Sequence, residues 1–265
     1  MAQASGNEGH ISTELESGVF LIGIDRPAKL NGFTPQMLRG MAQAYTAYEH
    51  EAAARCAVVY AEGKHFTAGL DLPKVAPHLG SDSLMVEENE IDPFDLRAPF
   101  RSKPVVFAVH GICFTLGIEM MLAADIVIAA SDTRFSQLEV KRGLMPTGGA
   151  TIRMVERAGW GNAMRYLLTG DEFDAATALR LGFVQEVVEP GKQLERAMEL
   201  AQHIAQQAPL AVSATITNAR CALADGPLSA RASFGIIQRG LLASDDFQEG
   251  LKSFKDKRPP KFSGQ

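Results

Sequence analysis

The chain has few cysteines, and their positions indicate neither a disulfide framework nor a zinc site. Its 265 residues include three cysteines, Cys56, Cys113 and Cys221, which are far apart and form no C-x-x-C pair. A long apolar run is also missing, because Asp125 interrupts the most apolar segment, 120–130. Residues 1–10 lack the basic and apolar regions of an export signal. We therefore expect a cytoplasmic protein that does not associate with a membrane.

The sequence has no long block of like charge. Its 26 Lys and Arg residues against 31 Asp and Glu residues give a net charge of -5, which argues against a dedicated nucleic-acid binder. With 46% hydrophobic and 22% charged residues, the chain can bury a core of the usual size for its length. One large domain, or one domain with a helical appendage, is expected.

Several common catalytic motifs are absent as well. The sequence contains no G-x-x-x-x-G-K-[ST], G-x-S-x-G or H-E-x-x-H string, and its histidines show no metal-ligand spacing. A string resembling G-x-G-x-x-G starts at Gly159, but Met164 takes its last position and the preceding residues, 151–158, have helical spacing. P-loop phosphoryl transfer, elbow-type serine hydrolysis, metal-dependent hydrolysis and nicotinamide binding are not expected.

The sequence does contain an alternation of short apolar strands with helices. Continuous β-rich runs of this kind are typical of parallel strands buried on both faces. They occupy residues 18–25, 56–61, 104–109 and 125–130. A helical pattern runs from Thr34 to about residue 54, with Thr34 as its N-cap and Pro35 at its first position. This order predicts an α/β fold.

Three segments depart from this alternation. Residues 1–10 are small and polar, so we expect a flexible terminus. Residues 73–102 are acidic and punctuated by proline, which indicates a mobile, partly helical flap. From residue 191 onward the spacing is helical throughout, and the tail at 252–261 carries five basic residues. The predicted divisions are 1–10, 11–190 and 191–265.

Two glycine-containing turns follow buried strands, at residues 66–71 and 110–117. The second leads into a helical run at 118–124. Backbone N–H groups in such turns and at helix starts are open to an anionic ligand. Two turns of this kind that faced each other would form an oxyanion hole, although either one alone is also an ordinary tight connection.

Glu119 is the first candidate for acid–base chemistry. It lies three residues beyond Leu116, so on a helix its carboxylate shares a face with the Leu116 N–H. Its apolar neighbours predict a desolvated carboxylate with a raised pKa, which suits proton transfer. The alternative is a structural glutamate paired with Arg134 or Arg153.

Glu139 is the second candidate. It follows the 125–130 strand and precedes Lys141 and Arg142. Considered alone, a glutamate in this setting is more often a solvated surface residue than a functional one.

At these residues the sequence resembles the crotonase (enoyl-CoA hydratase/isomerase) superfamily over nearly its whole length. The matching segments are DRPAKLN at 25–31, FTAGLD at 66–71, residues 103–125, FSQLE at 135–139 and PTGGAT at 146–151. The resemblance implies a crotonase-like spiral of β-β-α turns over 11–190. It also implies that the helical region at 191–265 serves oligomerisation into a homotrimer or homohexamer.

The resemblance also implies roles for individual residues. The N–H groups of Ala68 and Leu116 would form the oxyanion hole, and Glu119 and Glu139 would be the two catalytic glutamates. Contacts to the coenzyme A ester would come from Ala28, Leu30, Gly69, Leu70, Asp71, Phe254 and Lys257. The last two would often serve a neighbouring subunit. Coenzyme A is then part of the substrate, and no metal or redox cofactor is needed.

The sequence departs from the hydratase pattern at five positions around these residues. Hydratases usually have Gly-Gly at Thr115 and Leu116, proline at Leu138, and apolar residues at Lys141 and Arg142. A backbone donor tolerates a side chain, so Leu116 can still serve, but its bulk would narrow the acyl pocket. These differences put the exact reaction and the substrate in question.

Hydration of an α,β-enoyl-CoA is the expected reaction, because both glutamates are retained. Isomerisation of a β,γ- to an α,β-enoyl-CoA and hydrolysis of an acyl-CoA thioester are the enzymatic alternatives. An acyl-CoA-binding or RNA-binding scaffold is the alternative without catalysis, and the two carboxylates and the net charge of -5 argue against it.

Overall fold

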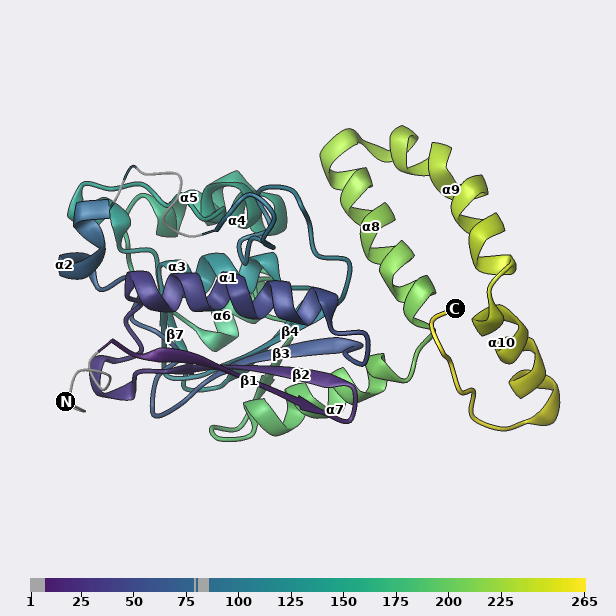
Figure 1. Cartoon of the computed structure of the whole chain (residues 1–265). Coiled ribbons are helices and arrows are strands. Elements are labelled where there is room, and N and C mark those ends of the chain that lie inside the picture. The colour runs from purple at the N-terminus through teal and green to yellow at the C-terminus, as the bar shows by residue number, and fades with distance from the viewer. Residues whose placement is uncertain (1–7, 79, 81–85) are drawn as a thin grey trace.

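A computed structural model describes residues 8–78, 80 and 86–265, and a six-stranded sheet lies at its centre (Figure 1). In spatial order the strands are β1 (His10–Glu16), β2 (Val19–Asp25), β3 (Cys56–Ala61), β4 (Val105–Val109), β6 (Ile126–Ala130) and β9 (Glu186–Val188). The β1–β2 pair is antiparallel and every other neighbouring pair is parallel. The strands expected from the apolar runs are β2, β3, β4 and β6.

A smaller sheet and several helices complete the core. The second sheet has the order β5 (Ile112–Phe114), β7 (Arg134–Ser136) and β8 (Phe173–Asp174). The helices of this part are α1 (Pro35–His50), α2 (Leu72–Val75), α3 (Leu116–Ala123), α4 (Ala150–Ala158), α5 (Trp160–Leu167), α6 (Ala175–Arg180) and α7 (Gln193–Ala205). As expected, Thr34 caps α1, its side chain accepting the Met37 N–H.

The large sheet is covered on both faces, which explains why its strands are continuously apolar. Val58 and Val106 face α7 and pack with Ala197 and Ala201. Their neighbours Val59 and Phe107 belong to the main core on the opposite face, together with residues of α1 and α3. Successive side chains of a strand point to opposite faces, so a strand between two cores has no polar positions.

The division expected after residue 10 differs by one residue from the start of the first strand, which the sequence pattern did not predict. Residues 1–7 lie outside the described part of the chain, but His10 already begins β1, the edge strand beside β2. Most of its side chains are exposed, and HISTELE has no continuous apolar pattern. An edge strand of this kind is stabilised by its ladder with β2, a contact that local sequence does not encode.

Among its described residues, which exclude 79 and 81–85, the acidic insert is helical only at its start. After α2 comes a single 3₁₀ turn at Ala76–His78, and residues 86–104 follow an irregular path back to β4. Asp92 organises part of this path, because its carboxylate accepts the N–H groups of Phe94 and Leu96. The segment packs onto the core through Ile91 and Phe94.

The C-terminal region is helical, as its spacing predicts. It continues from α7 through α8 (Pro209–Asp225), α9 (Pro227–Leu242) and α10 (Asp245–Asp256). Figure 1 shows α8, α9 and α10 extending to one side of the sheet and its covering helices. No residue of α8 is buried, and α9 buries only Ala230.

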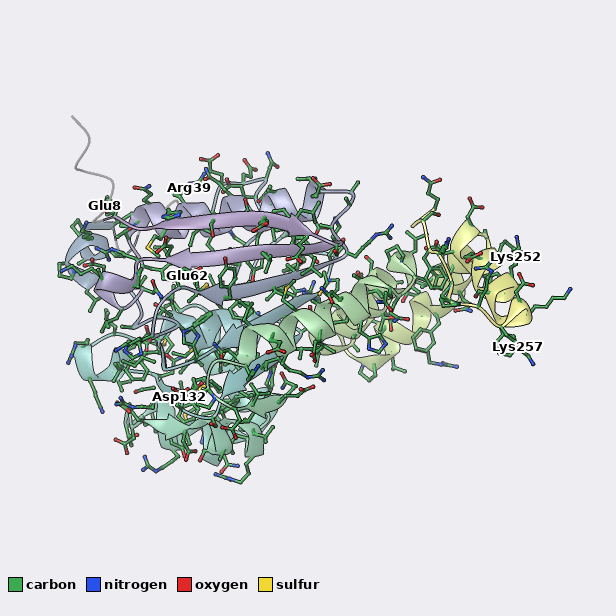
Figure 2. The ribbon with its side chains drawn as sticks, turned by 90° about the horizontal axis from the view of Figure 1, so that it is seen from below. Glu8, Arg39, Glu62, Asp132, Lys252 and Lys257 are labelled. Carbon is green, nitrogen blue, oxygen red and sulfur yellow. The ribbon has the colours of Figure 1, made fainter. Side chains whose placement is uncertain are left out.

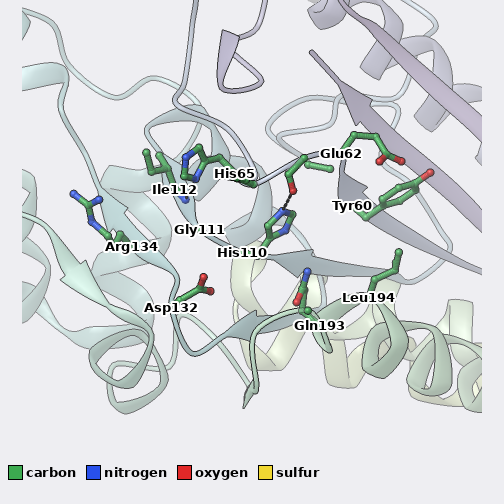
Figure 3. Close-up of a pocket in the computed structure, with 14 residues that line it drawn as sticks. Tyr60, Glu62, His65, His110, Gly111, Ile112, Asp132, Arg134, Gln193 and Leu194 are labelled. Carbon is green, nitrogen blue, oxygen red and sulfur yellow. Dashed lines mark hydrogen bonds between the residues drawn. The ribbon is translucent and has the colours of Figure 1, made fainter. Parts of the chain in front are cut away.

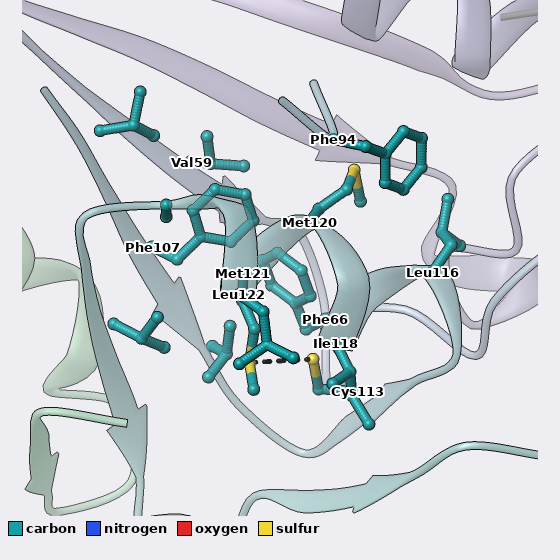
Figure 4. Close-up of a cluster of buried hydrophobic side chains, with 14 of the residues drawn as sticks. Val59, Phe66, Phe94, Phe107, Cys113, Leu116, Ile118, Met120, Met121 and Leu122 are labelled. Atoms are coloured by element: carbon teal, nitrogen blue, oxygen red, sulfur yellow. Dashed lines mark hydrogen bonds between the residues drawn. The ribbon is translucent and has the colours of Figure 1, made fainter. Parts of the chain in front are cut away.

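Helix α3 lies in the middle of the main core and is fixed at its C-terminal end. All eight of its residues are buried, among them Leu116, Met120 and Met121 (Figure 4). Two arginines donate to its terminal carbonyl groups, Arg157 to Leu122 at 2.6 Å and Arg101 to Ala123 at 2.9 Å. These bonds supply partners for carbonyl groups that no further helical turn can satisfy.

Candidate functional site

The two glycine-containing turns lie side by side. An isolated bridge pairs Thr67 with Cys113, and the Phe114 N–H donates to the Thr67 carbonyl at 3.0 Å. Leu70 and Leu116 each lie three residues beyond a member of this bridge. Within the described part of the chain, the N–H groups of Leu70 and Leu116 have no acceptor. The pairing therefore presents two open backbone donors from adjacent loops, which is what an oxyanion hole requires.

The assignment of Ala68 to the oxyanion hole is wrong. Its N–H donates to the carbonyl of Leu30 at 2.9 Å, so it is already used within the fold. The open donor of this turn belongs to Leu70, two residues later. Sequence spacing alone could not separate the two, because the difference depends on which residue of the turn faces the 26–31 loop.

Gly69 and Thr115 bring the two turns into contact. A Cβ on Gly69, whose φ is +103°, would lie 2.0 Å from the Thr115 hydroxyl oxygen, so no side chain fits there. Thr115 itself has a φ of 49°, a left-handed value that a threonine rarely adopts. Thr115 therefore fills the space that Gly69 leaves open, at the cost of backbone strain beside the open Leu116 donor.

A polar network ties the first turn to the 26–31 loop. Arg26 is buried and its guanidinium is 2.8 Å from the Asp71 carboxylate. Asn31 donates to the carbonyls of Glu62 and His65, and its own carbonyl accepts the Thr67 hydroxyl at 2.6 Å. Asp71, expected to contact the substrate, thus has a structural partner inside the protein.

The Glu119 carboxylate is buried and bound by backbone N–H groups. It accepts from Gly148 at 2.7 Å and from Ala150 at 3.3 Å, at the turn that begins α4. No described residue forms an ion pair with it; Arg134 pairs with Glu172, and Arg153 acts on Glu119 only through its charge. Burial raises the pKa of Glu119, while the two N–H bonds and Arg153 oppose that rise.

Glu139 lies in a 3₁₀ turn, η4 (Glu139–Arg142), close enough for Glu119 to act on it. Burial, together with the negative charge of Glu119, raises the pKa of Glu139 to about 7. The buried Gln137 side chain, with its amide nitrogen turned toward Glu139, donates to both carboxylate oxygens at 3.0 and 3.1 Å. Gln137 therefore fixes the orientation of Glu139, and no motif in the sequence indicates this contact. Glu139 is not the solvated surface residue that its flanking charges also allowed.

The environments of the two carboxyl groups differ in a way that separates their protonation. Glu119 receives two backbone N–H bonds, which favour its ionised form. Glu139, with its pKa raised to about 7, retains a proton to a higher pH. A pair of this kind can hold one base and one acid near neutral pH.

A cleft of about 430 Å³ opens beside the Leu70 turn. Its lining includes Ala68, Leu70 and Asp71 together with two lysines, Lys29 and Lys74. Sequence reasoning did not single out these lysines, although Lys29 is part of the matching DRPAKLN segment. Ala28 lies in the preceding 3₁₀ turn at Pro27–Lys29, and the Leu30 carbonyl is the acceptor for Ala68. Of the predicted residues, Ala68, Leu70 and Asp71 thus line one cleft. Lysines such as Lys29 pair with phosphate groups, whereas Lys74 already forms an ion pair with Glu8.

The tail residues expected to bind coenzyme A are not part of this cleft. Phe254 lies in α10 and is 88% exposed, and Lys257 directly follows that helix. Figure 2 shows Lys252 and Lys257 at the outer end of the helical region, far from Glu8 and Arg39 at the other end of the molecule. Within one protomer, Phe254 and Lys257 do not meet the two turns.

A larger cavity, of about 640 Å³, lies elsewhere, at the end of β3 and β4 and the start of α7 (Figure 3). Its lining includes His65, His110, Asp132 and Gln193 but neither glutamate of the candidate site. His110 Nε2 is 3.0 Å from the Gly63 carbonyl oxygen. Among the residues that the structure describes, no group of three or more His, Cys, Asp or Glu side chains could hold a metal ion.

Comparison with known proteins agrees with this geometry. The family model for enoyl-CoA hydratase/isomerase matches residues 14–265. The chain belongs to the enoyl-CoA hydratase/isomerase family. It is 30% identical to enoyl-CoA hydratase EchA19 of Mycobacterium tuberculosis, over 95% of this chain and 96% of that protein. It is 31% identical to 1,2-epoxyphenylacetyl-CoA isomerase of Escherichia coli, over 96% and 98% of the two chains.

Solved structures of the family share the whole fold. A probable enoyl-CoA hydratase/isomerase from Mycobacterium abscessus superposes with a TM-score of 0.93 at 46% identity, covering 96% of this chain and 98% of that one. Enoyl-CoA hydratase from Mycobacterium tuberculosis gives 0.88 at 34% identity, covering 97% and 99%. The chain is thus a crotonase-superfamily enzyme with the crotonase fold. Among its described residues, no helix is both long and apolar enough to cross a membrane.

Proposed function

We propose that this enzyme adds water across the α,β double bond of an acyl-CoA thioester. The observation that carries the proposal is the pair of dissimilar glutamates beside two open backbone donors. Glu119 is bound by N–H groups that favour its ionised form, whereas Glu139 has a pKa raised to about 7. Hydration needs a base for the water and an acid for the α-carbon.

In this mechanism Glu119 takes a proton from water as the water oxygen bonds to the β-carbon. The π electrons move toward the thioester oxygen, which accepts hydrogen bonds from the N–H groups of Leu70 and Leu116. Each well-placed donor of this kind contributes about 2.7–4 kcal/mol to the transition state. Glu139 then gives its proton to the α-carbon as the carbonyl re-forms. The reverse order of proton movements carries out dehydration.

Isomerisation is the second candidate, because it uses the same oxyanion hole and needs only one carboxyl group to move a proton. Two relatives named as isomerases support it. Besides the Escherichia coli protein, Δ(3,5)-Δ(2,4)-dienoyl-CoA isomerase of Dictyostelium discoideum is 32% identical over 89% of this chain and 85% of its own length.

One experiment separates these reactions. The enzyme is incubated with enoyl-CoA esters of both double-bond positions and several chain lengths, and products are identified by mass and chromatography. Hydration gives a product heavier by one water, and isomerisation gives an unchanged mass with a new retention time. Hydrolysis releases free coenzyme A. Unchanged substrates throughout the panel would exclude the proposed chemistry.

We also propose that the enzyme assembles as a trimer or hexamer through its helical region. Leu223, Leu228, Phe234 and Ile236 are each more than half exposed on α8 and α9. Several large apolar side chains exposed on neighbouring helices favour an interface with another copy of the chain. In such an assembly Phe254 and Lys257 would reach the coenzyme A bound by a neighbouring protomer. Light scattering that reports a monomer would exclude this arrangement.

A further inference from the structure

A chain of charged side chains connects α8 to the carboxylate of Glu119. The first link is Arg220 of α8, whose guanidinium is 2.9 Å from the Asp95 carboxylate. The second is the Asp95 backbone, whose carbonyl accepts from Arg153 of α4 at 3.0 Å. Asp95 and Arg220 are both partly buried, with 11% and 24% of their side chains exposed. Their contact is therefore a specific one, unlike an exposed surface ion pair.

Arg153 also contacts the Gly148–Gly149 turn, which binds Glu119. Its guanidinium occupies the space beside Gly149, where a Cβ would lie 2.3 Å from it, and donates to the Gly148 carbonyl at 3.5 Å. The N–H of Gly148 is one of the two donors to Glu119. Gly149 is the N-cap of α4 and has no side chain with which to cap the helix. Arg153 therefore stabilises a turn whose N-cap residue has no side chain to cap the helix.

Asp95 is also adjacent in sequence to Phe94, whose ring packs close to the Glu119 carboxylate. It has a left-handed φ of 53°, and its neighbour Phe94 packs so closely that a Cβ on Gly148 would lie 2.7 Å from the ring and 2.8 Å from the Glu119 carboxylate. The Phe94 ring and the Glu119 carboxylate thus both lie where a side chain of residue 148 would be. A shift of residues 94–95 would therefore move both the Phe94 ring and the Gly148–Gly149 turn.

We propose that Arg153, Asp95 and Arg220 are positioning residues that hold the Gly148–Gly149 turn, and through it Glu119. Turnover then depends on the position of α8, which carries Arg220. None of the three is required to touch the substrate. The inference rests on the proposed function, in which Glu119 is the base. It goes further by tying that base to the helical region through which we expect the enzyme to assemble.

The charges that face Glu119 determine the expected pH dependence. They are Glu139 of η4 and Arg153 of α4, and Arg153 is in turn affected by the charges of Asp92, Asp95, Arg101 and Glu156. The positive charge of Arg153 lowers the pKa of Glu119. Because a base works only when deprotonated, removal of this charge raises the pKa of Glu119 and moves the acid limb of the pH profile to higher pH.

The test compares Arg153→Met, Arg220→Met and Asp95→Asn with the intact chain on its best enoyl-CoA substrate. We expect kcat to fall about tenfold, with KM changed less than about twofold, as for groups that act on the transition state alone. For Arg153→Met the acid limb should also move to higher pH. Arg220→Lys, which keeps the charge beside Asp95, should retain most of the activity.

Arg239→Met is the matched control, because Arg239 is an exposed arginine of the neighbouring helix α9. Its kcat and pH profile should be those of the parent. A double-mutant cycle adds Arg220→Met to Glu119→Gln, where the second change should have almost no further effect if it acts through Glu119. Thermal melting and light scattering establish that each variant is folded and assembled.

Two results would overturn the inference while leaving the proposed function intact. One is a folded Arg220→Met or Asp95→Asn variant with the parent's kcat. The other is an Arg220→Met effect of the same size with and without Glu119. If Arg220→Met does not fold, Asp95→Asn and Arg220→Lys decide the same question. An intact chain that turns over no thioester would instead refute the proposed function.

Discussion

In the proposed mechanism Glu139 is a proton donor, and it is also a partly buried carboxyl group. Replacing it by glutamine should therefore lower turnover and raise stability at the same time. Burial and the charge of Glu119 raise the pKa of Glu139 from 4.5 to about 7, so the folded protein holds this carboxyl in its neutral form. Glutamine has the same shape and no charge. Loss of a positioned acid should lower kcat by about 10²–10⁴-fold.

The expected change in the free energy of unfolding follows from the difference between the pKa of Glu139 in the unfolded chain and its pKa in the folded protein. From 4.5 to about 7, at about 1.4 kcal/mol per pKa unit, it amounts to about 3 kcal/mol. Because Glu139 is only partly buried, solvent screening reduces this to about 1–2 kcal/mol. The folded-state pKa is the higher one, so wild-type stability is complete below about pH 4.5 and falls as the pH rises through about 7.

Thermal melting of the wild type and Glu139→Gln at several pH values tests this reasoning. The two should melt together near pH 4.5, whereas near pH 8 the variant should melt higher by about 2–4 °C per kcal/mol gained. Glu16→Gln, which removes an exposed carboxylate of β1, is the control and should show no such trend. A variant with near-normal turnover, or with a stabilisation that is the same at both pH values, would refute the account of Glu139 as a buried acid.

The remaining predictions concern the other parts of the site. Glu119→Gln should lower kcat by about 10²–10⁴-fold with little change in the affinity for a CoA ester, and an active variant would exclude it as the base. Leu116→Ala should keep kcat within about tenfold and shift preference toward bulkier acyl chains, whereas Leu116→Pro, which deletes the N–H, should lower kcat about 10²–10³-fold. Specificity constants over an acyl-chain series test both expectations. An Ala variant that ranks substrates as the parent does would show that Leu116 does not line the acyl pocket. Deletion from Phe254 onward should weaken binding of a CoA ester more than of a short pantetheine thioester, and equal losses by calorimetry would exclude a role for the tail in binding the nucleotide end.

Much of the fold was predictable, because its central strands are buried on both faces and carry their own signal. β2, β3, β4 and β6 are continuous apolar runs, and the helical spacing after residue 191 is unmistakable. β1 and the short strands of the second sheet were not predictable. Their residues are few or partly exposed, and pairing with distant partners stabilises them.

The candidate site divides in the same way. Glu119 was predictable as a buried carboxylate, because its apolar neighbours on a helix place it in the core. The partner of its carboxylate was not, since Gly148 and Ala150 come from a turn about thirty residues away in sequence. The choice between Ala68 and Leu70 depended on one hydrogen bond to Leu30. Local pattern cannot report a contact of that kind.

Helix α3 sets a fixed scale for the chemistry. It carries the Leu116 N–H at its start and Glu119 three residues later, so their separation along the axis is about 4.5 Å at about 1.5 Å per residue. Arginines hold the other end of the same helix. In the proposed mechanism, the backbone spacing between the oxyanion donor Leu116 and the base Glu119 is therefore set by an α-helix. Glu139, the proposed acid, belongs to a separate 3₁₀ turn with exposed neighbours, so a change in that turn can move the proposed acid while the spacing within α3 stays the same.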